Sequence, residues 1–442
     1  MGNKVALHNL GCKVNAYEIE AMQQLLEEAG YEIVPFEPGA DIYVINTCTV
    51  TNIADRKSRQ MLHKAKKMNP EAIVVATGCY VQTGGEKLEK DEAIDLVLGN
   101  NQKINIVEAL AEYAENKPGH GSHVIKINQT KEYEDLSIDH TAEHVRAYIK
   151  VQDGCNQFCT YCIIPYARGR VRSRNIESVL KEVRALAEKG YKEVVLTGIH
   201  LSSYGVDFPE EKKETLLSLI RAVHEIEGIR RIRLGSLEPG IVTREFAEGI
   251  AALPKVCPHF HLSLQSGCDE TLERMNRRYR SGEYRDRCEL LREVYGNPAL
   301  TTDVIVGFPQ ESEEEFRKSY DFVDSIRFYE THIFKYSRRQ GTKAAAMDGQ
   351  LTEAEKSFRS EKMIELHHRH AGDYEKSMLG KNLEVLIEEE YTKDGRTWYL
   401  GHSREYIKTA VPKSEAYGVN DIVIVKAEGF LEEHIMTGEA VE

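Results

Sequence analysis

The sequence predicts an α/β protein with three parts. These are an N-terminal parallel α/β (Rossmann-like) domain over residues 1–118, a central (β/α)6 partial barrel over 140–372 and a small C-terminal β-barrel over 375–442. Short apolar runs alternate with helical patterns along most of the chain, which is typical of parallel sheets covered by helices. The pattern changes over residues 381–442 to short alternating strands, which are predicted at 383–388, 397–401, 406–409, 421–427 and 430–436. The length of 442 residues also fits three domains of about 150 residues each.

The composition is that of an ordinary globular chain, with 41% apolar and 29% charged residues. No apolar run approaches the roughly 18–20 residues that span a bilayer, and the N-terminus lacks the apolar core of a secretion signal. We therefore expect a cytoplasmic protein with no membrane contact, whose nine cysteines serve as ligands or buried thiols. The net charge of −13 does not exclude RNA binding. Charges are screened over about 8 Å at physiological salt, so binding depends on a local basic surface and not on the total charge.

The first third of the chain alternates strands and helices. Strands are predicted at 5–10, 42–45, 73–77 and 96–98, and helices at 17–29 and 54–68. Cys12, Cys48 and Cys79 each follow the end of one of these strands. Because parallel strands end at one edge of an open sheet, we expect the three thiols to converge on one site. The alternative, three unrelated buried thiols, is common for cysteine, but the repeated placement favours a shared site.

The middle of the chain repeats a β–α unit about six times, after a polar linker at 117–143 with short strands near 124–127. The strands are predicted at 148–151, 193–197, 230–234, 260–264, 301–306 and 332–334, with helices at 176–189, 215–225, 243–252, 283–295 and 313–326. In such barrels the chemistry lies on the loops that follow the strands. Segments rich in Gly, Ser, Cys and Pro occupy those positions, at 154–162, 197–200, 235–239, 265–267 and 307–309.

The loop after the first barrel strand carries Cys155, Cys159 and Cys162 within eight residues. Three thiolates on a short loop suit a soft metal or an iron–sulfur cluster. A structural zinc site requires four protein ligands, and the sequence offers no fourth ligand nearby. A 4Fe–4S cluster held by three cysteines leaves one iron open to a small molecule. This loop therefore predicts a cluster with an open coordination site.

The spacing Cys-x3-Cys-x2-Cys resembles the signature of radical S-adenosylmethionine enzymes, and its neighbours Asn156, Thr160-Tyr161, Pro165 and Arg168-Gly169 strengthen the match. Together with Gly11-Cys12, Asn46-Thr47-Cys48 and Gly78-Cys79, it makes nearly the whole chain resemble the methylthiotransferases. The resemblance implies an N-terminal methylthiotransferase domain, a radical barrel and a C-terminal TRAM barrel that binds RNA. The run Gly11-Cys12-Lys13-Val14-Asn15 looks most like the bacterial members that act on N6-threonylcarbamoyladenosine beside the tRNA anticodon.

The resemblance implies two 4Fe–4S clusters and S-adenosylmethionine as cofactors. Cys155, Cys159 and Cys162 would hold the cluster that binds S-adenosylmethionine and cleaves it to a 5′-deoxyadenosyl radical. An auxiliary cluster, which carries the sulfur or methylthio group, would be held by Cys12, Cys48 and Cys79. The radical would abstract hydrogen from C2 of the adenine, and a second S-adenosylmethionine would supply the methyl group. The expected partners are the tRNA anticodon stem-loop, an electron donor such as a flavodoxin, and a sulfur donor.

Further residues receive roles by their positions in the family pattern. The S-adenosylmethionine site would be lined by Thr197, Gly198, Ser236, Glu238, Ser263 and Gln265. Arg168 and Arg174 are expected to meet a phosphate or the substrate carboxylate, because the guanidinium binds such groups with two hydrogen bonds. Basic residues that follow the barrel strands predict a rim for an RNA backbone, at Arg168, Arg170, Arg172, Arg174, Arg277, Arg278, Arg280, Lys335, Arg338 and Arg339.

Two other interpretations stay open at this point. Within the family, the substrate could be N6-isopentenyladenosine in tRNA or an aspartate of a ribosomal protein. Outside it, the cysteines could be structural ligands in a non-catalytic iron–sulfur or zinc module that binds RNA. Iron and zinc contents of the purified protein distinguish the last interpretation from an enzyme.

Overall fold

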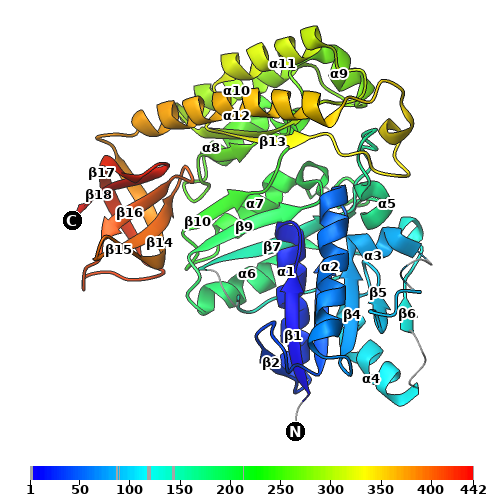
Figure 1. The fold of residues 1–442 in the computed structure, drawn as a ribbon. Helices are drawn as coiled ribbons and strands as arrows, with labels where there is room; N and C mark the ends of the chain where they lie inside the picture. The colour runs from blue at the N-terminus through cyan, green and yellow to red at the C-terminus, as the bar shows by residue number, and fades with distance from the viewer. Residues whose placement is uncertain are drawn as a thin grey trace.

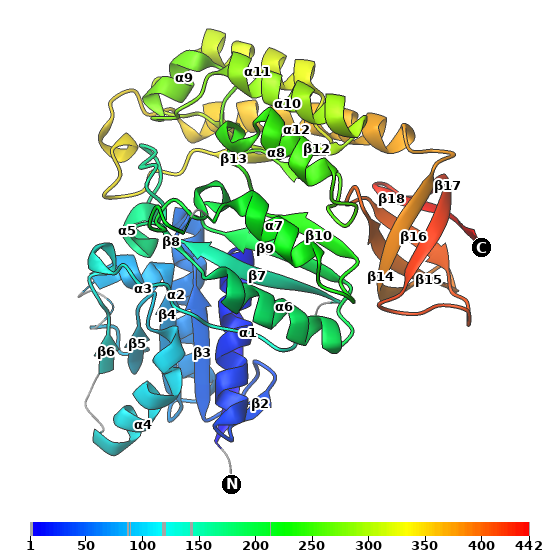
Figure 2. The same ribbon diagram turned by 180° about the vertical axis from the view of Figure 1, so that it is seen from behind.

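The computed structural model describes residues 3–85, 88, 90–116, 121–141, 145–212 and 214–441 (Figure 1). Three bodies follow one another along the chain: an N-terminal α/β body, a central set of β–α units, and a small C-terminal barrel. The C-terminal barrel lies beside the strand β10 of the central part, far from the N-terminal sheet in both views (Figures 1 and 2). The predicted fold class is confirmed.

The N-terminal body is a parallel sheet of order β2-β1-β3-β4-β5-β6. Its elements are β1 (Lys4–Asn9), α1 (Lys13–Glu28), β2 (Glu32–Val34), β3 (Ile42–Thr47), α2 (Asn52–Met68), β4 (Ile73–Gly78), α3 (Cys79–Gly84), β5 (Leu96–Leu98), α4 (Ile106–Asn116) and β6 (Gly121–His123). β3 is buried along its whole length, as expected for a central strand with helices on both faces. Apolar clusters on the two faces of the sheet hold it together.

Helix α1 begins four residues earlier than the predicted start at residue 17, because Cys12 itself occupies the N-cap position. The Asn15 side chain stabilises this first turn by donating to the carbonyl oxygens of Leu10 and Thr47. The side chain of Tyr17, also on α1, is fully buried and enters the apolar core of the central part. The N-terminal body and the barrel therefore share a core, which fixes Cys12 against the barrel.

The central part contains six parallel strands in sequential order. Its elements are β7 (Arg146–Asp153), α5 (Ile164–Arg168), β8 (Arg172–Ser173), α6 (Ile176–Glu188), β9 (Glu193–Gly198), α7 (Leu216–His224), β10 (Arg231–Leu234), α8 (Arg244–Ala251), β11 (His259–His261), α9 (Asp269–Arg274), α10 (Ser281–Tyr295), β12 (Ala299–Val306), α11 (Glu313–Ile326), β13 (Glu330–Lys335) and α12 (Glu353–Lys376). β8 pairs antiparallel with β7. Isolated bridges, including one between Leu237 and Leu262, join the sheet β10-β9-β7-β8 to the sheet β11-β12-β13.

The C-terminal part is a closed barrel of order β14-β15-β16-β18-β17. Its strands are β14 (Asn382–Lys393), β15 (Arg396–Ser403), β16 (Lys408–Pro412), β17 (Ile422–Glu432) and β18 (Ile435–Val441). The predicted single strand at 430–436 is wrong, because a hairpin turn with His434 at φ 61° separates β17 from β18. The predicted strand at 406–409 starts instead at Lys408, since Tyr406 has a left-handed φ of 69°.

Arginines of β10 dock the C-terminal barrel. The guanidinium of Arg231 donates to the Glu384 carboxylate at 2.8 Å and to the His402 carbonyl oxygen at 3.0 Å. Arg233 donates to the carbonyl oxygens of Ser403 and Arg404, at 2.6 and 2.8 Å. Because both guanidinium groups are buried, these bonds form in a low-dielectric setting and hold the barrel in one position.

The connections depart from the prediction in two places. The short strands expected near 124–127 are replaced by β6 and a 3-10 turn at Ile127–Gln129. The predicted boundary at residue 118 lies outside the described residues, and the one at 372–375 falls within α12. Among the described residues, no helix is both long and apolar enough to cross a membrane.

Candidate active site

The loop after β7 carries Cys155, Cys159 and Cys162. A tight turn starts it at Gly154, whose φ is +72° and whose position would place any Cβ 1.9 Å from the Arg170 carbonyl oxygen. The Cys155 amide then donates to the Gly169 carbonyl oxygen at 3.0 Å. A side chain at position 154 would therefore collide with the Arg170 backbone and displace the cysteine loop. This steric conflict explains why position 154 is a glycine.

The three thiols of this loop act on one another electrostatically. Burial, together with the neighbouring Cys159 sulfur, raises the pKa of Cys155 to about 11 and that of Cys162 to about 12. The Arg277 guanidinium donates to the Cys159 sulfur at 3.2 Å, and the Gln157 amide donates to the Cys155 sulfur at 3.5 Å. Three soft sulfurs on one loop, with donors already directed at two of them, are the ligand type of an iron–sulfur cluster.

Cys12, Cys48 and Cys79 converge at the carboxyl edge of the N-terminal sheet, as predicted from their strand ends. Burial raises the pKa of Cys12 and, to about 11, that of Cys48, and the charge of Cys79 adds to both shifts. Gly11 packs against Cys48, since a Cβ added there would lie 3.3 Å from its sulfur. The set again consists of three soft sulfurs and fits a second cluster.

The sulfur of Cys79 accepts hydrogen bonds from the Arg168 Nε at 3.1 Å and from the Asn100 Nδ2 at 3.7 Å. Arg168 is fully buried and also binds the Glu18 carboxylate and the Asn15 side-chain oxygen. A guanidinium so placed neutralises thiolate charge beside the second set of cysteines. This contact replaces the expected role of Arg168 in binding phosphate, because no part of its side chain is exposed.

The contact of Arg168 belongs to a buried group of charges between α1 and β7. The Glu18 carboxylate accepts from Lys103 Nζ at 3.0 Å and from Lys150 Nζ at 2.8 Å, and Lys150 also pairs with Asp153 at 2.8 Å. Burial alone would raise the pKa of Glu18, but Arg168, Lys103 and Lys150 hold it well below its usual range. We call this group the charge cluster (Glu18, Lys103, Lys150, Asp153 and Arg168). It connects the two sets of cysteines, because Arg168 donates to Cys79 and Asp153 lies two residues before Cys155.

The predicted role of Arg174 in binding a phosphate or carboxylate of the substrate is also replaced by a structural one. Its buried guanidinium pairs with Glu182 and donates to the Asp135 carboxylate at 2.7 Å. The basic rim is accordingly smaller than predicted, since Arg172 and Arg339 are buried too. The exposed members are Arg170, Arg278, Arg280, Lys335 and Arg338.

A cavity of about 500 Å³ opens between the start of α1 and the carboxyl ends of the barrel strands. All three parts of the chain line this central cavity. Its wall includes Cys12, Lys13, Thr197, Gly198, Ser236, His259, His261, Asp303, Glu330, His332 and Tyr406. Three of the residues predicted for S-adenosylmethionine therefore face the same space as Cys12.

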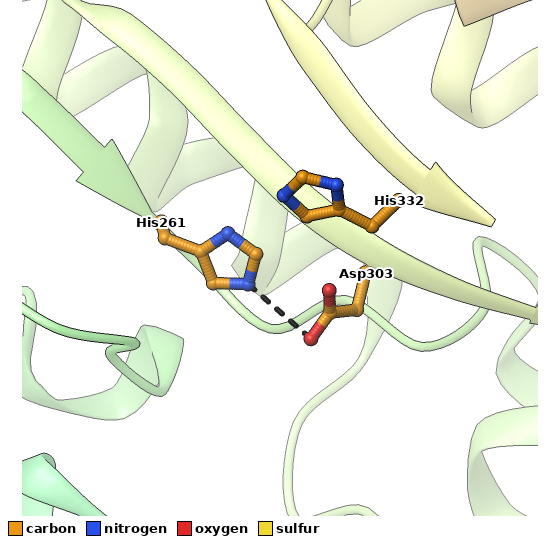
Figure 3. Close-up of side chains that lie close together, drawn as sticks. All are labelled: His261, Asp303 and His332. Atoms are coloured by element: carbon orange, nitrogen blue, oxygen red, sulfur yellow. Dashed lines mark ion pairs between the residues drawn. The ribbon is translucent and has the colours of Figure 1, made fainter. Parts of the chain in front are cut away.

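Three neighbouring strands present His261, Asp303 and His332 on one wall of the central cavity (Figure 3). His261 Nε2 lies 3.3 Å from the Asp303 carboxylate, and the two imidazoles stack with centroids 5.6 Å apart. The other nitrogen of His261 hydrogen bonds with the Thr301 hydroxyl at 3.0 Å. One ligand atom from each of the three residues lies within 4.8 Å of the others, so the wall offers closely spaced polar groups.

The remaining residues predicted for S-adenosylmethionine are distributed over other places. Glu238 lines a second cavity with Gln157 and His200, and Gln265 lines a third with Tyr161 and Asp303. Ser263 is absent from the described walls of these three cavities, and its carbonyl oxygen accepts from Tyr279. Asp303 borders both the central and the third cavity, which places them side by side.

Several site residues have roles that the sequence does not predict, among them Arg277, which was expected in the basic rim. Arg277 pairs with Glu238 at 3.0 Å while it donates to Cys159, so it links the cysteine loop to that carboxylate. His261 and His332 could have been found from their places near strand ends, where chemistry concentrates in barrels. Tyr406 packs against His259 of β11, which lies 147 positions earlier in the chain, and no local pattern predicts that contact.

Comparisons with known proteins follow the same division of the chain. The family described as "Uncharacterized protein family UPF0004" matches residues 4–99, and the "Radical SAM superfamily" matches residues 149–323. The threonylcarbamoyladenosine tRNA methylthiotransferase MtaB of Bacillus subtilis is 41% identical over 96% of this chain and 93% of its own length. Its counterpart in Aquifex aeolicus is 43% identical, over 88% and 93%.

A relative with another name is the tRNA-2-methylthio-N(6)-dimethylallyladenosine synthase of Finegoldia magna, 34% identical over 98% of this chain and 93% of its own. Among solved structures, the radical S-adenosylmethionine methyltransferase TsrM of Kitasatospora setae aligns with a TM-score of 0.58 at 18% identity. It covers 78% of this chain and 77% of its own, and at that identity it supports the fold alone.

Proposed function

The chain belongs to the tRNA methylthiotransferases of the radical S-adenosylmethionine superfamily, and on this premise we propose that it methylthiolates C2 of N6-threonylcarbamoyladenosine beside the anticodon. The observation that carries the choice of substrate is the wall of the central cavity. Lys13, Asp303, Glu330 and the histidines make it ionic and polar. A threonylcarbamoyl group can form hydrogen bonds and an ion pair with these residues, whereas an isopentenyl group would displace their water and leave them unpaired.

Enzymes of this family bind S-adenosylmethionine and two 4Fe–4S clusters. We propose that Cys155, Cys159 and Cys162 hold the first cluster and that Cys12, Cys48 and Cys79 hold the second. When bound, these groups supply the radical and the sulfur, and the protein positions them and excludes water. The chain's own contribution is support, since Arg277 neutralises charge at the first set of thiols and Arg168 at the second.

The carboxylate of Glu238 is our candidate for a direct contact with S-adenosylmethionine. Burial alone would raise its pKa, but the hydrogen bond from His200 and the Arg277 guanidinium lower the pKa overall. An ionised carboxylate near the cysteine loop suits an amino group or ribose hydroxyls. Thr197, Gly198 and Ser236, on the central cavity, are proposed to line the same cofactor, with Gln265 and Ser263 at its margin.

Glu238→Gln keeps the shape of this side chain and removes its charge. Because a hydrogen bond to a charged group contributes about 1.5–3 kcal/mol, we expect the Kd for S-adenosylmethionine to rise about 10- to 100-fold. Equilibrium dialysis with cluster-loaded protein measures this affinity. Glu248→Gln, at an exposed position on α8, is the matched control, and equal affinities in the two variants would contradict the assignment.

The tRNA is proposed to approach over exposed cations, namely the rim residues that remain and Arg56, Lys57, Lys64 and Lys67 on α2. The C-terminal barrel adds a shape that often binds oligonucleotides. A reductant such as a flavodoxin and a separate sulfur donor are the further partners that we propose.

Mass analysis of tRNA nucleosides from a strain without this gene tests the proposed substrate. We expect the 2-methylthio form of threonylcarbamoyladenosine to disappear while the isopentenyl series keeps its methylthio group. Loss of only the isopentenyl product would overturn the proposal and favour the dimethylallyladenosine synthases among the relatives.

A further inference from the structure

The side chain of Lys13, which ends in an ammonium group, lines the central cavity. Lys13 is the first residue of α1, directly after Cys12, and its side chain is exposed at the cavity wall. None of the described residues hydrogen bonds or ion-pairs with this ammonium. Lys103 and Lys150 differ, because each lies within 3.0 Å of the Glu18 carboxylate. An unpaired cation at a cavity wall is available to an anionic ligand.

The described charged residues near Lys13 do not pair with its ammonium group, so this group is available to a ligand. The nearby cations Arg146 and Arg233 are already engaged, Arg146 with Glu388 at 3.1 Å and Arg233 with Glu193 at 2.7 Å. Glu330, which lines the same cavity, makes no ion pair within the described part of the chain. Asp303 has His261 as its ion-pair partner and keeps part of its carboxylate exposed. Among the described residues that line the cavity, Lys13 is therefore a cation without an ion pair, and Glu330 and part of the Asp303 carboxylate remain available as acceptors.

We infer that Lys13 binds the carboxylate of the threonylcarbamoyl group and thereby selects the N6 substituent that the enzyme accepts. This inference rests on the proposed function. The threonylcarbamoyl group carries one carboxylate, which matches Lys13, and hydroxyl and urea N–H donors, which match Glu330 and Asp303. An isopentenyl group has none of these atoms, so its entry would strip water from Lys13 without replacing it.

The position of Lys13 also sets the direction of the substrate. Lys13 follows Cys12, which we assign to the cluster that carries sulfur, so a carboxylate held there fixes the substituent beside that cluster. The adenine would then extend towards the S-adenosylmethionine that Thr197 and Ser236 are proposed to line. Lys13 is a substrate-binding residue in this arrangement and takes no part in the bond changes.

The test pairs two enzymes with two RNAs. Wild type and Lys13→Met are assayed on an anticodon stem-loop with threonylcarbamoyladenosine and on the same RNA with the threonyl carboxylate converted to an amide. We expect the wild type to lose about 10- to 100-fold in kcat/KM on the amide, mainly through KM, as for a lost charge-assisted hydrogen bond. Lys13→Met should show a similar loss on the natural RNA and no further loss on the amide.

Controls separate this role from damage to the neighbouring cluster. Iron content and the rate of S-adenosylmethionine cleavage should match the wild type in Lys13→Met, and Lys13→Arg should regain part of the activity. Lys181→Met, an exposed lysine on α6, should behave as wild type on both RNAs. Glu330→Gln removes an acceptor proposed for the substrate but keeps Lys13, so it should still favour the carboxylate RNA over the amide RNA. If Glu330→Gln lost this preference as Lys13→Met is expected to, Lys13 would only balance Glu330, and the inference would be overturned.

Two failures can be told apart. Undiminished discrimination between carboxylate and amide in Lys13→Met would overturn the inference and leave the proposed function in place. A wild-type enzyme that methylthiolates isopentenyladenosine RNA and ignores the threonylcarbamoyl RNA would overturn the proposed function itself.

Discussion

An enzyme with Cys12, Cys48 and Cys79 replaced by Ala is expected to cleave S-adenosylmethionine at close to the wild-type rate and to form no methylthio product. The physical reason is the separation of the two sets of thiols, which lie on different bodies of the chain and have different supporting arginines. Counting 5′-deoxyadenosine and methylthionucleoside in the same reaction measures both activities.

The matched variant, with Cys155, Cys159 and Cys162 replaced by Ala, should lose cleavage and product together. Cys268→Ala, a buried thiol that donates to Glu270, should keep both activities. Methylthio product from the variant without Cys12, Cys48 and Cys79 would show that this set is not the source of the sulfur.

Glu18→Gln is expected to lower the free energy of unfolding by about 3–5 kcal/mol, the usual cost of breaking a buried ion pair from one side. The substitution leaves Lys103, Lys150 and Arg168 with Asp153 as the remaining carboxylate of the charge cluster. Urea unfolding followed by circular dichroism measures the change. Glu28→Gln, exposed on the same helix, should change stability by less than about 0.5 kcal/mol.

The effect of Glu18 should depend on pH in one direction. Its pKa is lower in the folded protein than in the unfolded chain, so its stabilisation is complete above the unfolded pKa of about 4.3 and is lost as the pH falls through the folded value. The gap between wild type and Glu18→Gln should therefore close in acid. Glu18→Gln combined with Lys103→Met should recover part of the lost stability, and strictly additive losses would contradict the coupling.

Much of the fold could be predicted from the sequence because its strands and helices have clear periods. The predicted helix at 313–326 matches α11, which has the Ser312 and Glu315 side chains as a capping box. The start of α1 could not be predicted, because hydrogen bonds from the Asn15 side chain to Leu10, just after β1, and to Thr47, the last residue of β3, fix its first turn. Local sequence patterns do not record such contacts. The final hairpin could not be predicted because its turn, Glu433-His434, contains none of the Gly, Asn, Asp or Pro residues that usually mark a hairpin.

Site residues could be predicted where their spacing in the sequence identifies them. They could not be predicted where their role depends on burial in the folded protein. Strand-end positions sufficed to bring Cys12, Cys48 and Cys79 together. Arg168 and Arg174 look like surface cations in the sequence, but both are buried and paired with acids, Arg168 with Glu18, 150 positions away, and Arg174 with Glu182, eight positions along. The partner of a charged residue is set by the tertiary fold, and no periodicity in the sequence reports it.

The central claim is that the six cysteines hold two separate clusters. Iron analysis of anaerobically reconstituted protein tests it most directly. We expect about eight irons per chain in the wild type and about four in each of the two triple variants. Eight irons in either variant, or zinc in place of iron in the wild type, would contradict the account.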